Sequence, residues 1–429
     1  MLQEKAALRG LLVAELWSPP HPKPAPRGPA LKDWLSRLSF SVSGVLAYSD
    51  PHALPIVEEV LSLVGLTGSG DVTSDALLEQ ARRNKHLMQV VLKEAGLTSC
   101  RWVLACSESE VQSFVEAEPS QTAVMKPFLG GSAGNNVTLL DYGNRPRESE
   151  AFVRQVFSSR PTGAESMPVL VQEHLQGDEY AVDIVVRDGE MAVMGVFKYD
   201  VRPLNGAEFV VFGVFIEPIQ KGSPEEAVAN YAMESLAALG MRNGPAHVEV
   251  KMTAKDPVLI EANCNRFTGL DMIFDIAERA VGYTAIDAFL DAADARVSAE
   301  EWRSRYPVLP SPNLRAYGGV AQMHARKSGI YEGGDEEAAA EIMELDSVYK
   351  LESRDIAVGY PLARTVSDAT CPAEVGLLCN SRSQLMADYD RIFQIERRMF
   401  RVKETGFNIW YRTALEPWQT SQAYSIGNS

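Results

Sequence analysis

The chain has 429 residues and a formal charge of −16, from 41 basic and 57 acidic side chains. This length suggests roughly three domains at about 150 residues each, and the acidic balance argues against nonspecific binding to nucleic acid or anionic membranes. Five widely spaced cysteines without a CxxC pair suggest neither a disulfide framework nor a zinc site. No secretory signal or membrane-spanning run is recognised. We therefore expect a cytoplasmic protein with a small ligand.

The N-terminal part of the chain has the pattern of a small α/β domain. Residues 18–29 are rich in proline and predict an extended surface loop. A strand over 40–50 and helices over 51–66 and 76–97 follow from the hydrophobic periodicity. This domain is expected to end near residue 95.

The middle of the chain is dominated by β-branched and apolar runs, which predict antiparallel β-rich units with few helices. Turns are expected at Asp188-Gly189 and Asn205-Gly206. The predicted strands cover residues 101–106, 122–128, 135–141, 168–175, 179–200 and 207–219. A helix over 228–241, a hairpin over 245–265, a helical stretch over 273–293, a β-containing segment beyond 310 and a helix over 383–401 complete an α/β (α+β) fold.

A glycine-rich loop follows an apolar strand that ends at Lys126. The loop contains Gly131, Ser132 and Gly134. Glycines let backbone amides approach an anion, and a lysine beside them supplies a charge for phosphate oxygens. The lysine precedes the glycines, so this is not a Walker A loop. A plain β-hairpin explains the same pattern.

A second candidate segment, QEHLQGDE, ends another apolar strand. Its backbone suits the edge of an adenine ring, with Gln172 and Glu173 at the hinge. Leu175 would cover the face of the ring, and Glu179 would accept the ribose hydroxyls. The alternative is an edge strand with solvated acids before a turn.

The third candidate is a pair of strands, HVEV and VLIEAN. Alternation places His247 and Glu249 on one face of the first strand, and Glu261 and Asn263 on one face of the second. Two carboxylates and an amide are the oxygen ligands that Mg²⁺ accepts beside nucleotide phosphates. Surface acids in salt bridges are the alternative, but unpaired acids between apolar residues are costly. We favour a metal site.

Three basic residues complete the candidate site. Arg266 lies three residues after Asn263 and would clamp a phosphate or carboxylate, or else pair with Asp271. Taken singly, Lys85 and Lys198 are weak candidates, because lone lysines are usually solvated. Their order along the chain relative to the other candidates supports them.

In this order, the candidates resemble the ATP-grasp superfamily from about residue 70 to 295. The segment HVEVK…VLIEANCNRFTG is most similar to L-amino acid ligases of the bacilysin dipeptide synthase type. The resemblance implies three lobes that grip ATP. The implied domains are 1–95 (N-terminal, shortened), 96–175 (small lobe), 176–310 (large lobe with the metal site) and 311–429 (C-terminal segment).

The resemblance also assigns roles to the candidate residues. ATP would be bound by Lys85, Lys126, Gly131, Ser132, Gly134, Gln172, Glu173, Leu175 and Glu179; Mg²⁺, or Mn²⁺ in its place, by Glu249, Glu261 and Asn263; the catalytic candidates are Arg266, Lys198 and His247. The implied enzyme joins a carboxylate to an amine, with amino acids as substrates, through an acyl phosphate, and family habit favours a homodimer. A ligase or carboxylase with a non-peptide acceptor and a non-catalytic ATP-binding protein are the alternatives.

Overall fold

The computed structural model describes residues 2–9, 33, 35–38, 60, 80–82, 84–127, 137–159, 168–354 and 356–404. The proline-rich loop at 18–29, the strand predicted over 40–50 and most of the helix predicted over 51–66 lie outside these residues. The chain divides into two compact units. Unit 1 contains Met1–Thr98, Tyr180–Phe197 and Ile216–Arg315, and unit 2 contains Ser99–Glu179, Lys198–Phe215 and Ala316–Ser429. The boundaries of the four predicted domains stay predictions.

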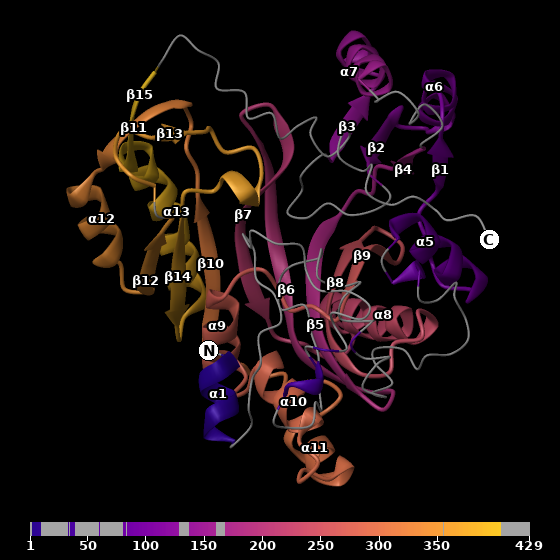
Figure 1. Cartoon of the computed structure of the whole chain (residues 1–429). Coiled ribbons are helices and arrows are strands. Elements are labelled where there is room, and N and C mark those ends of the chain that lie inside the picture. Colours follow the sequence, from indigo (N-terminus) through magenta and orange to yellow (C-terminus); the bar gives the residue numbers. More distant parts are fainter. Residues whose placement is uncertain are drawn as a thin grey trace. The chain divides into compact units, whose positions relative to one another are not determined.

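Helices and strands alternate irregularly along the described residues (Figure 1). The helices are α1 (Leu2–Leu8), α5 (Lys85–Glu94), α6 (Glu108–Ala117), α7 (Pro146–Ser158), α8 (Pro224–Ala238), α9 (Met272–Ala280), α10 (Ala285–Ala293), α11 (Ala299–Arg305), α12 (Glu336–Met343) and α13 (Arg382–Met399), with a 3₁₀ turn at Asp368–Thr370. The strands are β1 (Trp102–Ala105), β2 (Thr122–Lys126), β3 (Thr138–Asp141), β4 (Val169–Glu173), β5 (Asp178–Arg187), β6 (Glu190–Leu204), β7 (Ala207–Glu217), β8 (Gly244–Met252), β9 (Pro257–Cys264), β10 (Tyr317–Met323), β11 (Gly329–Gly334), β12 (Val348–Ser353), β13 (Pro361–Leu362), β14 (Ala373–Cys379) and β15 (Phe400–Lys403).

Unit 1 is built on neighbouring strands in the order β6-β5-β8-β9. One face packs on α5 and α8 through a core that includes Met88, Leu236 and Val248. The opposite face carries Val185 and Met194, which pack with side chains of α9, α10 and α11, including the fully buried Trp302. Both faces are covered, and the central residues 180–186 of β5 are all buried and, apart from Asp183, apolar, as expected for a strand buried on both sides.

Unit 2 contains two larger sheets and a small one. The order β1-β4-β2-β3 forms a four-stranded sheet, and α6 and α7 pack on one of its faces (Figure 1). The strands β12-β14-β10-β7, with the last part of β6, form the second sheet, against which α12 and α13 pack. A three-stranded sheet has the order β13-β11-β15. The four-stranded sheet carries the candidate site residues Lys126, Gln172 and Glu173.

Short-range patterns predicted the hairpins of the chain well. Asp188 and Gly189 have φ of 52° and 87°, and Asn205 and Gly206 have φ of 53° and 89°. Positive φ at both central residues is the requirement of the two-residue turn that matches strand twist. The predicted turns between β5 and β6 and between β6 and β7 are confirmed.

The helical stretch predicted over 273–293 is interrupted, and α9 and α10 replace it. Gly282 has φ of +105°, and a Cβ there would lie 2.5 Å from the guanidinium of Arg315. Thr284 then starts α10 with a capping box that includes Asp287. Helices α6 and α7 were not predicted, although Ser107 caps the first and a proline opens the second.

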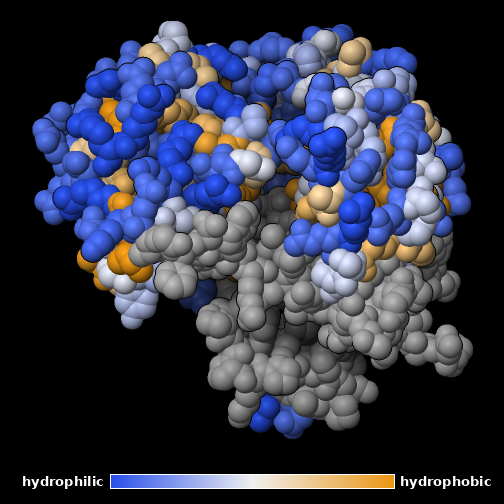
Figure 2. Space-filling model, turned by 90° about the horizontal axis from the view of Figure 1, so that it is seen from above, coloured by the Kyte–Doolittle hydropathy of each residue, from blue (hydrophilic) through white to orange (hydrophobic). Residues whose placement is uncertain are grey.

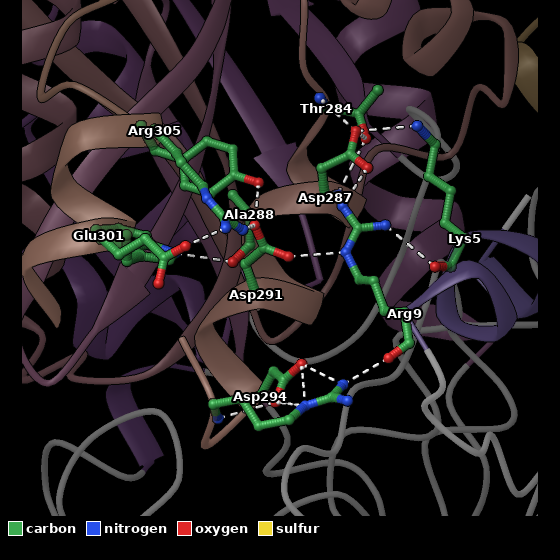
Figure 3. A network of polar contacts seen from close by, with 12 residues as sticks. Lys5, Arg9, Thr284, Asp287, Ala288, Asp291, Asp294, Glu301 and Arg305 are labelled. Carbon is green, nitrogen blue, oxygen red and sulfur yellow. Dashed lines mark hydrogen bonds and ion pairs between the residues drawn. The ribbon is translucent and has the colours of Figure 1, made fainter. Parts of the chain in front are cut away.

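An ion-pair network ties α1 to α10 within unit 1 (Figure 3). The Arg9 guanidinium donates to Asp291 Oδ1 at 2.7 Å and to Asp287 Oδ1 at 2.8 Å. Arg305 and the Tyr306 hydroxyl also donate to Asp291, at 2.6 Å and 2.8 Å. Burial raises the pKa of Asp291, but these donors outweigh it and hold the pKa below its ordinary value.

We expect Asp291→Asn to lower the free energy of unfolding at pH 7 by about 2 kcal/mol, less than for a fully buried pair because Arg305 is half exposed. A depressed carboxyl pKa contributes stability above its unfolded value of about 3.9, and that contribution is lost as the pH falls through the folded pKa. The variant should therefore lose less stability than the parent between pH 5 and pH 2, on the order of the difference at pH 7. Chemical denaturation of parent and variant at pH 7 and between pH 5 and pH 2 measures these differences in the free energy of unfolding. Equal acid sensitivity of the two proteins would contradict the stabilising role of the Asp291 carboxylate.

The coloured part of the face shown in Figure 2 is mainly hydrophilic, with small apolar patches between polar side chains. Within the described residues, every helix is too short or too polar to traverse a lipid bilayer.

Candidate functional site

The hairpin of β8 and β9 gathers four of the predicted site residues in unit 1. His247 lies opposite Asn263, and Glu249 lies opposite Glu261, in the antiparallel register. Residues directly opposite each other point to the same face, as do residues two apart on one strand. All four side chains therefore share one face, as the sequence predicted.

A β-bulge follows the acidic pair. Glu249 opposes Glu261, but the next residue, Val250, opposes Leu259, so Ile260 is the extra residue. Bulges redirect side chains and are common beside active sites. This one lets Leu259 join the apolar core with Val250 while Glu261 keeps the face of Glu249.

Two carboxylates directly opposite each other repel unless a cation lies between or beside them. In unit 1, Lys85 at the start of α5 supplies a positive charge, because its Nζ lies 2.9 Å from Glu261 Oε1. Asn84 caps α5 by accepting from the backbone N–H groups of His86 and Leu87. The lysine predicted to contact ATP phosphates is thus brought to the acidic pair.

Two buried polar groups at and just after the end of β9 each have an atom without a hydrogen-bond partner among the described residues. Arg266 is 9% exposed and its Nε has no hydrogen-bond partner among the described residues. Asn263 is 6% exposed, and its Nδ2 also has no hydrogen-bond partner among the described residues. Buried donors are nearly always paired, so these two atoms are suited to an anionic or oxygen-rich ligand.

His247 is held from the opposite side by Asp183 of β5. Its Nδ1 donates to Asp183 Oδ1 at 2.7 Å, and its Nε2 lies 3.7 Å from Glu249 Oε1. Burial lowers the pKa of His247, but Asp183 and Glu249 outweigh it and raise the pKa above its ordinary value. Arg266 lies close enough to oppose that rise.

These residues fit a magnesium ion bound together with a nucleotide. Carboxylate and amide oxygens are the ligands Mg²⁺ takes, and it usually keeps some positions for water and phosphate. Within residues 2–404, apart from the gaps given above, no group of three or more His, Cys, Asp or Glu side chains could hold a metal by itself. Glu249, Glu261 and Asn263 could therefore supply only some of the ligands of such an ion, and phosphate oxygens would have to supply others.

Unit 2 brings Lys126 and Gln172 to one face of the four-stranded sheet. Lys126 lies opposite Leu170, and Val124 lies opposite Gln172, so alternation places both polar residues on the face away from α6 and α7. Gln172 Nε2 lies 3.1 Å from Cys100 Sγ. Burial raises the pKa of the Cys100 thiol to about 12, against the opposing charge of Lys126, so this cysteine stays protonated.

Glu173 is not brought together with these two side chains. Alternation puts it on the opposite face of β4, where its Oε2 accepts from Arg101 Nε at 3.1 Å. Arg101 also pairs with Glu118. The predicted contact of Glu173 with the edge of adenine would therefore be made by its backbone and not by its side chain.

The remaining predicted residues of unit 2 lie near the start of β5. Lys198 Nζ donates to Asp178 Oδ2 at 2.7 Å, while Leu175 and Glu179 are partly buried. Gly131, Ser132 and Gly134 of the predicted phosphate loop lie outside the described residues.

The residue that sequence reasoning missed is Asp183. It is 5% exposed, and its neighbours on both sides along β5 are apolar and buried. An acid inside such a run is costly unless it is paired. That signal was present in YAVDIVV, but its partner lies 64 residues further along the chain.

Comparisons with known proteins agree with this architecture. The ATP-grasp domain profile matches residues 145–273, which include β8, β9 and Arg266. Dapdiamide A synthase of Enterobacter agglomerans is 28% identical over 261 residues, 59% of this chain and 59% of that protein. The match thus spans less than two thirds of that relative.

Solved structures share the fold. The L-amino acid ligase of Bacillus licheniformis superposes with a TM-score of 0.67 at 17% identity, covering 87% of this chain and 84% of the other. The biotin carboxylase domain of the Hydrogenobacter thermophilus 2-oxoglutarate carboxylase, solved with MgADP and bicarbonate, gives 0.52 at 13% identity over 82% and 72% of the two chains. The predicted ATP-grasp fold of helices and antiparallel sheets is confirmed. Residues 145–273 thus match the ATP-grasp domain, and the chain is similar in sequence to a dapdiamide synthase and in fold to an L-amino acid ligase.

Proposed function

We propose that the protein is an ATP-dependent carboxylate–amine ligase that forms an amide bond between amino-acid substrates and releases ADP and phosphate. The observation that carries the proposal is the pair Glu249 and Glu261, directly opposite on β8 and β9. A partly buried acidic pair with Asn263 beside it suits a nucleotide-bound Mg²⁺, or Mn²⁺ in its place. The names of the relatives, a dapdiamide synthase and an L-amino acid ligase, support the amino-acid substrates.

The proposed roles follow the two units. In unit 1, Glu249, Glu261 and Asn263 would hold the metal, which when bound neutralises charge on the phosphates. Lys85 would contact phosphate oxygens. In unit 2, we assign Lys126 to the phosphates, with the loop at Gly131, Ser132 and Gly134; Gln172, the backbone of Glu173 and Leu175 to adenine; and Glu179 to ribose.

The chemistry we propose needs no protein nucleophile. The substrate carboxylate attacks the γ-phosphorus of ATP, the bond to the β,γ-bridging oxygen breaks, and ADP leaves. The amine then attacks the acyl phosphate carbonyl, loses a proton and releases phosphate. We assign to Arg266, which is buried and has an Nε without a partner among the described residues, the stabilisation of charge on the transferring phosphoryl group or the substrate carboxylate. Lys198 and His247 are further candidates for this task.

A substrate screen tests the proposal. Purified protein with ATP and Mg²⁺ is offered pairs of amino acids, and coupled ADP release is followed by mass spectrometry of the products. An ADP-releasing pair should give an amide of the summed mass less water. Added hydroxylamine should intercept the acyl phosphate as a hydroxamate. Release of AMP and pyrophosphate instead of ADP would contradict the acyl-phosphate route.

Two other outcomes would redirect the assignment. ADP release that needs a different kind of acid or acceptor would point to a biosynthetic ligase or carboxylase with a non-peptide acceptor. Nucleotide binding without ADP release for any acid and amine would point to a non-catalytic ATP-binding protein. The cytoplasmic location and the homodimer stay predictions, the second of which sedimentation would test.

A further inference from the structure

Asp183 is a buried acid that none of the roles above uses. It lies in the centre of β5, between Val182 and Ile184, which are both fully buried. The two packed layers on either side of the sheet are apolar. A carboxylate in this setting is costly unless it is hydrogen-bonded, so its contacts indicate its purpose.

The partner of Asp183 is the imidazole of His247, on the neighbouring strand β8. The two residues are 5% exposed each, and Oδ1 lies 2.7 Å from Nδ1. A carboxylate accepts hydrogen bonds, so the proton of this bond is on Nδ1. The bond fixes the rotation of the ring and directs Nε2 away from Asp183.

Nε2 is directed toward the acidic pair. It lies 3.7 Å from Glu249 Oε1, too far for a good hydrogen bond but close enough to limit where that carboxylate can swing. His247 and Glu249 share one face of β8, and Glu261 lies opposite Glu249. The three side chains Asp183, His247 and Glu249 thus form a row that begins in the sheet interior and ends at the acidic pair.

We propose that Asp183 is a positioning residue, which through His247 holds Glu249 in the orientation needed to bind a divalent metal with the nucleotide. The inference rests on the proposed metal role of Glu249 and Glu261. It assigns to Asp183 an effect on metal affinity without any contact with metal, nucleotide or substrate. Outer groups that orient a metal ligand typically change metal affinity by about 10- to 100-fold when removed.

The test is a metal titration that does not depend on turnover. Mn²⁺ binding is measured by electron paramagnetic resonance in the presence of a non-hydrolysable ATP analogue, for the parent, Asp183→Asn, His247→Ala and the double variant. We expect each single variant to weaken Mn²⁺ binding by roughly 10-fold or more. The double variant should be no weaker than the worse single one, because both act through one path.

Asp256→Asn is the matched control. Asp256 is exposed in the turn that joins β8 to β9, so the same chemical change there should leave Mn²⁺ binding unchanged. If Asp183→Asn lowers the melting temperature but binds Mn²⁺ as the parent does, the pair is merely structural and the inference is overturned. If Asp183→Asn does not fold, His247→Gln decides by the same titration. Additive effects in the double variant also overturn it.

The results that would contradict the ligase proposal differ from those that would contradict the role of Asp183. A parent protein that binds Mn²⁺ and the nucleotide but releases no ADP would contradict the ligase, while the titration still decides the role of Asp183. A parent that binds no Mn²⁺ with the nucleotide would overturn the metal role and the inference together. In an active parent, Asp183→Asn should lower kcat by roughly 10-fold and leave the KM of the amine unchanged.

Discussion

Glu261→Gln is expected to reduce ADP release by about 10²- to 10³-fold or more while the protein stays folded. The substitution keeps the shape of the side chain but removes one of two opposed carboxylates. It also removes the charge that Lys85 Nζ pairs with at 2.9 Å. The remaining glutamate cannot by itself neutralise a metal and hold it beside the phosphates. Initial rates with ATP in excess, at several Mg²⁺ concentrations, measure the loss.

The control for this experiment is Glu234→Gln. Glu234 is exposed on α8 of the same unit, so the same loss of one negative charge should leave the rate within a factor of about two. Circular dichroism and the melting temperature establish that both variants are folded. Full activity of Glu261→Gln would exclude the metal role of the acidic pair.

Arg266→Lys is expected to lower kcat by about 10²-fold. Lysine keeps the positive charge but lacks the planar fork that binds two oxygens at once. Arg266 is 9% exposed and its Nε has no partner among the described residues, so its donors are suited to a ligand. An interaction made chiefly in the transition state lowers kcat and kcat/KM together.

The matched control for Arg266 is Arg279→Lys, on the exposed side of α9. That change should leave kcat and the melting temperature unchanged. An Arg266→Lys protein with parental kcat and a lowered melting temperature would show that this arginine only stabilises the fold. A raised KM for the carboxylate substrate with parental kcat would instead assign it to substrate binding.

The parts of the site that were predicted from the sequence depend on short-range rules. Strand alternation placed Glu249, Glu261 and Asn263 correctly because one hairpin joins their strands, so the register follows from local geometry. The Asp188-Gly189 and Asn205-Gly206 turns were predictable because few residues adopt positive φ at two successive positions. The order of these segments along the chain then pointed to the ATP-grasp fold.

The parts that were not predicted depend on contacts between distant segments. The face of β4 on which Glu173 lies, and its pairing with Arg101, follow from the pairing of β4 with β1 and β2. The bond of Asp183 to His247 requires β5 to lie beside β8. The break between α9 and α10 at Gly282 depends on Arg315 packing against it. Each of these contacts joins residues from different elements, so the sequence pattern of a single element does not predict it.

The extra residue at Ile260 separates the geometry of the acidic pair from the exact length of β9. Leu259 and Glu261 are two positions apart yet lie on opposite faces, because the bulge absorbs the residue between them. Deleting Ile260 would make the two residues neighbours in a regular strand, where alternation again places them on opposite faces and keeps Glu261 opposite Glu249. During the divergence of related sequences, a one-residue gap at position 260 should therefore be tolerated, whereas Glu261 should keep its place opposite Glu249. Gap placement in a set of homologues would reveal that rule even where the amino acids themselves vary.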